Sequence, residues 1–262
     1  MSTKDVLITG GTRNTGFVIA KTFAKAGYRV HITGRKLGDV KTAAERIKAE
    51  YPETEVFPYS LEMSDVLDIN RVFGEIKANA GKLDVFVANA ANLGVDLDIY
   101  NTTEEDFDAV MNVNVKGNFF CCQNAAKLMK DNGGRIVLIS SVQSKGAVEG
   151  RTVYSTSKAA LNMLGKTLAY DLAPYKIQVN TLIVGAIHSD RWDVLDEETT
   201  AKRRSAYPSG RESYPEDVAN AVMYFAKDCP DTVTGTELTI DSGVLLSILP
   251  YRDRKQFKRE DF

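Results

Sequence analysis

Cysteine and histidine are scarce in this sequence, with three Cys and two His among 262 residues. Cys121 and Cys122 are adjacent, which disfavours a disulfide between them, and Cys229 stands alone, so we expect no disulfide framework. The two histidines, His31 and His188, are far apart, and the chain contains no CxxC or HxxxH spacing. Zinc sites usually need such spacings, so we predict no metal.

Long apolar runs are also missing. No segment approaches the roughly 20 apolar residues of a membrane-spanning helix, and residues 1–4 lead directly into the apolar run 6–8 without a signal-peptide core. Charge of one sign is not in excess either, because 33 Lys plus Arg face 35 Asp plus Glu. Proteins that neutralise nucleic-acid phosphates usually carry a basic excess. We therefore expect a reduced, cytoplasmic protein with no nucleic-acid or membrane partner.

Short apolar runs alternate with helical patterns along the whole chain. Strands are predicted at residues 6–9, 29–33, near 56, 84–88, 135–140, 178–183 and 237–240. Helices are predicted at residues 17–26, 39–50, 65–79, from 102–105 toward 130, 153–173 and 215–226. This alternation indicates an α/β Rossmann fold, a doubly wound parallel sheet of about seven strands with helices on both faces.

No linker, repeat or low-complexity tract divides the chain. We therefore interpret residues 1–248 as a single domain. The polar segment 188–213 lacks clear periodicity, which suits a mobile loop or short helices over a substrate site. Residues 249–262 are strongly charged and are predicted to form a solvated C-terminal tail.

A glycine-rich turn follows the first predicted strand and leads into a helix. Glycines at such a position let a pyrophosphate approach the unpaired N–H groups of the helix start. The middle glycine of a typical loop is replaced by Asn14, a residue that tolerates positive φ. An ordinary βα connection is the alternative reading. The candidate cofactor residues of this turn are Gly10, Thr12, Arg13, Asn14, Thr15 and Gly16.

The end of the second strand bears on the choice of cofactor. NAD sites usually place an acid there for the ribose 2′-hydroxyl, whereas a 2′-phosphate requires cations. Arg35 and Lys36 occupy this position without an acid, and Arg13 can add a second guanidinium. We therefore predict NADP(H) as the cofactor. These side chains can also be simple solvated charges, an alternative that is stronger for Lys36 than for the arginines.

Tyr154 and Lys158 lie four residues apart in a predicted helix and therefore share one face. A lysine cation beside a tyrosine stabilises phenolate and lowers the phenol pKa from about 10, which makes the tyrosine useful as an acid or base. Tyr-x-x-x-Lys alone is a weak signal, because amphipathic helices carry it by chance.

Taken with its surroundings, this pair resembles the classical short-chain dehydrogenase/reductase family over nearly the whole chain. Ser141 lies thirteen residues before Tyr154, as the family's catalytic serine typically does, and Asn114 in the run Asn-Val-Asn-Val-Lys-Gly matches its fourth catalytic position. The resemblance implies that Tyr154 exchanges the proton of a carbonyl or alcohol, Ser141 hydrogen-bonds the same oxygen, Lys158 holds the nicotinamide ribose, and Asn114 anchors a water.

The resemblance extends to further cofactor contacts. Ala88-Asn89-Ala90-Ala91 stands where the family has Asn-Asn-Ala-Gly, and Glu62 replaces the usual aspartate near the adenine. Ser189 matches the hydroxyl that holds the carboxamide, together with the backbone of Ile187. Besides Tyr154 and Lys158, the implied cofactor residues are Glu62, Met63, Asn89, Ala90, Gly185, Ile187 and Ser189.

Residues near the expected carbonyl are mostly polar: Gln143, Glu149, Arg151, His188, Arg191 and Trp192. The predicted substrate contacts are Ser141, Gln143, Tyr154, His188 and Trp192, although His188 and Trp192 can equally be packing residues. We expect an NADP(H)-dependent oxidoreductase acting on a small polar ketone, sugar or polyol. The alternative is a catalytically inactive NADP(H)-binding sensor. The family resemblance also implies a homo-oligomer, a tetramer or dimer.

Overall fold

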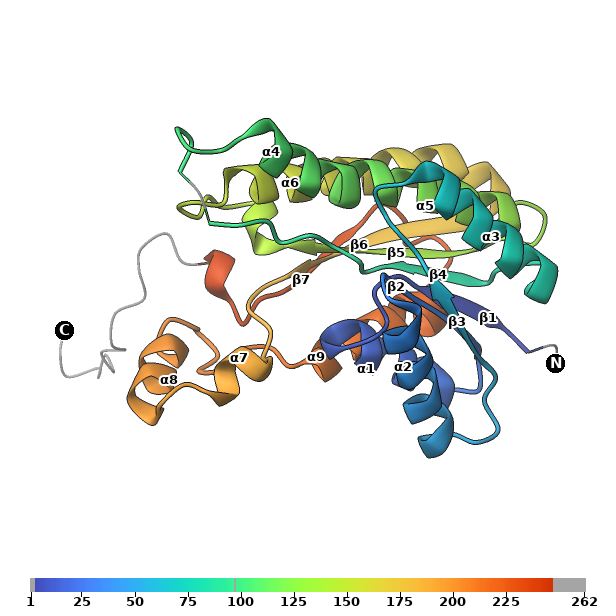
Figure 1. Ribbon diagram of the computed structural model, residues 1–262, viewed down its shortest axis with the longest axis horizontal. Coiled ribbons are helices and arrows are strands. Elements are labelled where there is room, and N and C mark those ends of the chain that lie inside the picture. Colours follow the sequence, from blue (N-terminus) through green and yellow to red (C-terminus); the bar gives the residue numbers. More distant parts are fainter. Residues whose placement is uncertain (1–2, 97, 247–262) are drawn as a thin grey trace.

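A computed structural model describes residues 3–96 and 98–246. Within these residues the chain forms one parallel seven-stranded sheet with the order β3-β2-β1-β4-β5-β6-β7 (Figure 1). The strands are β1 (Asp5–Ile8), β2 (Arg29–Gly34), β3 (Val56–Ser60), β4 (Val85–Ala88), β5 (Gly134–Ser141), β6 (Ile177–Val184) and β7 (Glu237–Ile240). The predicted fold class is confirmed, and the order reverses between β1 and β4, where open α/β sheets bind their ligands.

Helices cover both faces of the sheet (Figure 1). One layer contains α1 (Asn14–Lys25), α2 (Leu37–Glu50) and α9 (Pro215–Met223). The opposite layer contains α3 (Val66–Ala80), α4 (Glu104–Met111), α5 (Asn118–Met129) and α6 (Thr152–Leu172). Short single turns lie at Val142–Ser144, Ala173–Tyr175 and Val244–Leu246.

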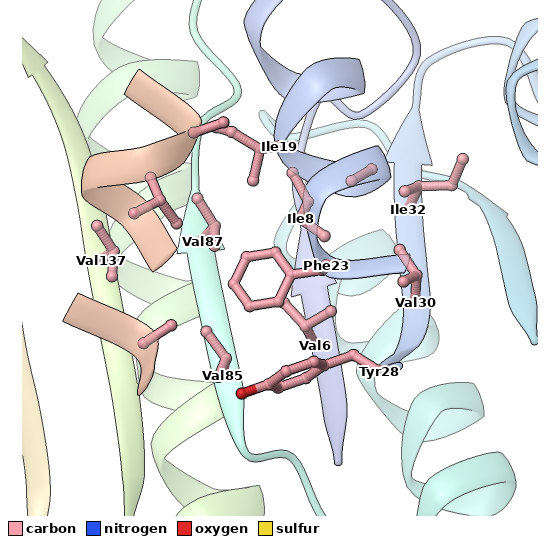
Figure 2. Close-up of a cluster of buried hydrophobic side chains, with 14 of the residues drawn as sticks. Val6, Ile8, Ile19, Phe23, Tyr28, Val30, Ile32, Val85, Val87 and Val137 are labelled. Atoms are coloured by element: carbon pink, nitrogen blue, oxygen red, sulfur yellow. The ribbon is translucent and has the colours of Figure 1, made fainter. Parts of the chain in front are cut away.

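The core on the α1 side shows why the strand sequences are almost continuously apolar. Successive strand side chains point to opposite faces, so Val6 and Ile8 pack beneath Phe23 of α1 while Leu7 belongs to the core on the other face (Figure 2). Each of these side chains has no exposed surface. A strand covered on both faces needs an apolar residue at nearly every position, and burial of each large side chain contributes about 2 kcal/mol.

The helix predicted from residues 102–105 toward 130 is interrupted. It begins at α4, widens into a π-type turn at Asn112–Gly117, and continues as α5. Its capping box uses Thr103 and Asp106, one residue later than the predicted pair, Thr102 and Glu105. Both registers place an acid three residues after a threonine, so the sequence alone does not choose between them.

The segment 188–213 forms short helices, the second of the two predicted alternatives. It contains α7 (Asp190–Asp193) and α8 (Glu197–Arg204), and a parallel bridge between Ile187 and Ser213 closes its base. Both helices lie beyond the sheet on the side opposite the N-terminus (Figure 1). The predicted tail 249–262 lies outside the described residues. Among residues 3–96 and 98–246, no helix is both long and apolar enough to cross a bilayer.

Candidate active site

The glycine-rich turn between β1 and α1 has the backbone needed for close approach. Gly10 has a φ of +68° and Asn14 a φ of +47°, so Asn14 adopts the left-handed conformation expected of it. A Cβ at Gly16 would overlap the Gly10 carbonyl oxygen, so only glycine fits there. No side chain caps the start of α1. Its first N–H groups are therefore available to a bound anion.

Asn89, at the end of β4, holds this turn in place. Its Nδ2 donates to the carbonyl oxygens of Thr9 at 3.0 Å and Gly10 at 3.2 Å, and its backbone N–H donates to Thr9 Oγ1 at 3.1 Å. The backbone N–H of Ala90 shares that hydroxyl. In this structure the Asn89 side chain therefore supports the turn, and its predicted contact with cofactor stays a prediction.

Two cavities meet at the carboxyl edge of the sheet. The first, which we call the Arg35 cavity, has a volume of about 790 Å³. The predicted residues that line it are Gly10, Thr12, Arg13, Arg35, Lys36, Glu62, Met63 and Ala90. The second, the Tyr154 cavity, has a volume of about 490 Å³. The predicted residues that line it are Arg13, Asn14, Thr15, Ser141, Gln143, Tyr154, Gly185, Ile187, His188 and Ser189. Arg13 and Leu93 line both cavities.

Three of the predicted cations lie on the wall of the Arg35 cavity, next to the turn. The side chains of Arg13, Arg35 and Lys36 are exposed on its wall, and within the described part of the chain none of them forms an ion pair. Three acids, Asp39, Glu62 and Asp108, also line it, and the carboxylate of Glu62 accepts hydrogen bonds from the N–H and the hydroxyl of Ser64.

Tyr154 and Lys158 share one face of α6, as the spacing predicts. The Lys158 Nζ lies 5.7 Å from the centroid of the Tyr154 ring and donates to the Ile139 carbonyl oxygen at 2.9 Å. Lys158 is only 3% exposed, and this burial lowers the pKa of its ammonium to about 8. In the cofactor-free chain the pKa of Tyr154 is raised, not lowered as its pairing with Lys158 predicts, because burial outweighs the hydrogen bond with Ser141 and the charge of Arg151. A phenol, a hydroxyl and a cation are thereby gathered at one point.

Asn114 lies behind this group in the π-type turn and does not line either cavity. Its side-chain amide forms hydrogen bonds with the backbone N–H and carbonyl of Asn92, at 2.7 and 2.9 Å, and with Ser157 Oγ at 3.0 Å. Its backbone carbonyl accepts a bond of 2.9 Å from Asn118 Nδ2. The predicted water-anchoring role stays a prediction.

His188 lines the Tyr154 cavity within a polar network that the sequence did not reveal. Its Nδ1 lies 2.9 Å from Glu212 Oε1, and its Nε2 lies 2.8 Å from Asp193 Oδ1. Glu212 has no exposed surface and also receives two bonds of 2.8 Å from Arg204. Arg204 is the main cause that lowers the pKa of Glu212 to about 2, despite its burial. No motif spacing signals this network.

The remaining candidates lie away from the cavity walls. Trp192 is 9% exposed and packs among His188, Tyr207 and the Arg203 guanidinium, so its contacts in this structure are packing contacts. Glu149 is exposed and lines neither cavity. In the part of the chain that the structure describes, no three His, Cys, Asp or Glu side chains gather as a metal site.

A doubly wound sheet, a phosphate-type turn and a Tyr–Lys pair at the same sheet edge together describe a Rossmann-type oxidoreductase. A family model described as enoyl-(acyl carrier protein) reductase matches residues 10–245. The chain belongs to the classical short-chain dehydrogenase/reductase family, whose oxidoreductases act on CH–OH and C=O groups.

Several known proteins resemble the chain over nearly its full length. It is 33% identical to the 3alpha-hydroxysteroid dehydrogenase of Mediterraneibacter gnavus, over 93% of this chain and 97% of that protein. It is 36% identical to the 3-oxoacyl-(acyl-carrier-protein) reductase FabG of Aquifex aeolicus, over 91% and 96%. Among solved structures, YwfH, an NADPH-dependent reductase involved in bacilysin biosynthesis, superimposes with a TM-score of 0.88 at 27% identity, over 94% of this chain and 100% of that chain.

Proposed function

We propose that this protein is an NADP(H)-dependent oxidoreductase that interconverts a carbonyl group and a secondary alcohol on a small polar molecule. The observation that carries the proposal is the joint placement of Tyr154 and Ser141 on one cavity, with the Lys158 ammonium buried directly behind the phenol. A protein that only senses cofactor has no need of this acid–base group.

Each of these side chains has a defined task. Tyr154 donates its phenolic proton to the carbonyl oxygen during reduction and takes it back during oxidation. Ser141, hydrogen-bonded to Tyr154, donates to the same carbonyl oxygen and stabilises the charge that develops there. Lys158, held by the Ile139 carbonyl, stabilises phenolate after proton transfer. A bound nicotinamide supplies or accepts the hydride at the carbonyl carbon.

The cofactor preference rests on the Arg35 cavity. Arg35 and Lys36 follow β2, and Arg13 lies in the β1–α1 turn on the wall of the same cavity. Guanidinium groups bind phosphate in bidentate fashion, so these residues would hold a 2′-phosphate. The uncapped start of α1 would accept the pyrophosphate, because it leaves backbone N–H groups open, and Gly16 permits the close approach of the Gly10 carbonyl oxygen within the turn.

A panel of small ketones, aldehydes, sugars and polyols, followed by cofactor absorbance with NADP(H) and NAD(H), tests the activity. We expect turnover of at least one member, with NADP(H) preferred. Binding of cofactor by calorimetry without turnover of any member would contradict the proposed activity and favour the sensor.

The cofactor preference has its own test. Arg35→Ala should raise the KM for NADP(H) far more than the KM for NAD(H), because only NADP(H) carries the 2′-phosphate. Lys41→Ala removes an exposed cation from α2, the helix that follows Arg35, outside both cavities, and serves as the control. An equal effect of Arg35→Ala on the two cofactors contradicts the preference.

The proposal includes self-association, as the family resemblance implies. Phe119 on α5 and Met163 and Tyr170 on α6 are exposed by 42%, 59% and 85%, respectively, on adjacent helices. Exposed apolar side chains gathered on one layer favour a contact with a second copy. Light scattering of the wild type and of Met163→Glu tests this, with a dimer or tetramer expected for the wild type only. The cytoplasmic location stays a prediction from the sequence.

A further inference from the structure

The charges on the wall of the Tyr154 cavity have one sign. Among its lining residues the charged or basic side chains are Arg13, Arg151 and His188, and no carboxylate belongs to the wall. A cavity with a purely cationic lining concentrates anions. Any cation on this wall that has no partner of its own therefore favours a negatively charged substrate.

Two of the three cations already have a use. His188 is hydrogen-bonded to the carboxylates of Glu212 and Asp193, both of which raise its pKa, so its charge is compensated within segment 188–213. Arg13 also lines the Arg35 cavity, where it belongs to the phosphate-binding set proposed above. Arg151 is the one cation of the three to which neither of these roles applies.

Arg151 is placed directly beside the reacting group. It is the N-cap residue of α6, one turn before Tyr154, and its guanidinium carbon lies 5.4 Å from the centroid of the Tyr154 ring. The side chain is 18% exposed. The positive end of a 21-residue helix lies at the same place, and it favours an anion there too.

The guanidinium is anchored on one side and open on the other. Its Nη1 donates to the Leu93 carbonyl oxygen at 2.9 Å and lies 2.7 Å from Asp96 Oδ1. Asp96 is 77% exposed, so this pairing is weak in water. Within residues 3–96 and 98–246, Nε and Nη2 of Arg151 donate to no protein group. These two nitrogens form one edge of the planar fork that binds a carboxylate in bidentate fashion.

We propose that Arg151 anchors an anionic substrate, and that the protein acts on an oxo acid whose carboxylate lies a few bonds from the carbonyl carbon. Anchoring through Nε and Nη2 keeps the reacting oxygen next to Tyr154 and Ser141. Gln143 lines the same cavity, and within the described part of the chain its buried Oε1 has no partner, so it can accept a hydrogen bond from a donor group of the substrate. The inference rests on the proposed function, and names the substrate class within it.

Matched acids and esters test the anchor. Pyruvate, acetoacetate and levulinate place the carboxylate progressively farther from the carbonyl, and each is compared with its methyl ester. We expect one acid to be reduced with a higher kcat/KM than its ester. Arg151→Gln should lower kcat/KM for that acid by about 10- to 100-fold more than for its ester, mainly through KM. Arg151→Lys should lose less than Arg151→Gln.

The controls separate recognition from a structural role. Arg151 also tethers Leu93 and lowers the pKa of Tyr154, and loss of either effect would slow acid and ester alike. Equal losses for the acid and the ester therefore overturn the anchor, while the proposed function stands. Lys145→Gln removes a cation from the segment before α6 that does not line the Tyr154 cavity, and it should leave the acid-to-ester ratio unchanged.

A binding measurement covers the case without turnover. The three acids are titrated by calorimetry into the wild type and Arg151→Gln, each saturated with NADP⁺ or NAD⁺ in separate experiments. Binding that is lost in Arg151→Gln supports the anchor even if no carbonyl is reduced, an outcome that contradicts the proposed function alone. Absence of binding to the wild type, or binding that Arg151→Gln retains, overturns the anchor.

Discussion

His188 Nδ1 lies 2.9 Å from Oε1 of Glu212, and this contact joins the two ends of segment 188–213 next to the Tyr154 cavity. Glu212 is completely buried, while the second carboxylate on His188, that of Asp193, is 64% exposed. A buried ion pair that loses one partner costs more than an exposed one. Glu212 is therefore the residue on which the order of this segment depends.

Glu212→Gln should loosen segment 188–213. The change removes the negative charge between His188 and Arg204 and lowers the pKa of His188, which Glu212 raises most. The raised pKa of His188 stabilises the folded state at low pH, and this contribution is lost as the pH rises through that pKa. Because the pKa of His188 is lower in the variant, the loss should occur at a lower pH than in the wild type. Trp192 is the single tryptophan and lies 6.0 Å from the His188 ring, so its emission reports the titration. Asp193→Asn should shift the midpoint less, and an unshifted midpoint in Glu212→Gln would contradict the role of Glu212.

Tyr154→Phe should abolish most turnover while leaving cofactor affinity intact. The change removes the phenolic hydroxyl and its hydrogen bond with Ser141 but keeps the ring in contact with Lys158. General acid–base groups contribute about 10²- to 10⁴-fold to rates, so a loss of that size is expected in kcat. Single-turnover kinetics and calorimetric cofactor titration measure the two effects. Undiminished turnover would show that another group transfers the proton.

Lys158 should give the cofactor-free protein a distinctive dependence of stability on pH. Burial lowers its pKa to about 8 from the ordinary 10.5, so between these values the unfolded chain holds a proton that the folded chain lacks. The free energy of unfolding that Lys158 contributes therefore rises with pH across this window. Urea unfolding of the wild type and Lys158→Met should show the wild type gaining relative stability from pH 8 to 10.5, by a few kcal/mol. A constant difference would mean that the folded-state pKa is not lowered.

Asn14 should tolerate glycine but not alanine. Its φ of +47° costs most L-residues roughly 1 to 2 kcal/mol, whereas glycine adopts this conformation freely. Asn14→Ala should therefore lower the free energy of unfolding by about 1 kcal/mol, and Asn14→Gly should leave it nearly unchanged. Urea unfolding measures both variants. Equal stability of the two would contradict a conformational role for Asn14.

Asp5 should be a major buried electrostatic contact of the sheet. It is fully buried, with Arg29 Nη2 at 2.8 Å and His31 Nε2 at 2.9 Å. Burial raises its pKa, but the hydrogen bonds from His31 and Arg29 together hold it below the ordinary value. Asp5→Asn should lower the free energy of unfolding by about 3 kcal/mol at neutral pH. The wild type should lose this advantage as the pH falls below about 4, where the carboxylate of the unfolded chain binds a proton before that of the folded chain does.

A matched control for Asp5 is available on the surface. Asp231 pairs with Arg135 at 2.5 Å but is 85% exposed. Asp231→Asn should cost between about 0 and 1 kcal/mol, because water competes for both charges. Equal costs for the two substitutions would show that burial does not set the strength of the Asp5 contacts.

Helices and strands could be predicted because their signals are local. Residues 237–240 were predicted as a strand and form β7, and Pro215 begins α9 as expected for its fixed φ. The π-type turn at Asn112–Gly117 could not be predicted, because its sequence continues a helical pattern. Contacts distant in sequence accompany it: the Asn114 amide binds Asn92, and a Cβ at Gly117 would overlap the Met63 carbonyl oxygen.

Within the candidate site, the sequence by itself determined the residues whose chemistry depends on short spacing. Tyr154 and Lys158 share a helix face because any two helical residues four apart do so. Asn14 can replace glycine because asparagine itself tolerates positive φ. Only the tertiary structure decided which charges face the same space. In the fold, the carboxylate of Glu212 lies against His188 and compensates its charge, whereas one edge of the Arg151 guanidinium stays open beside Tyr154. Charges act through distance in space, and the folding of the sheet, not the order of the chain, sets that distance.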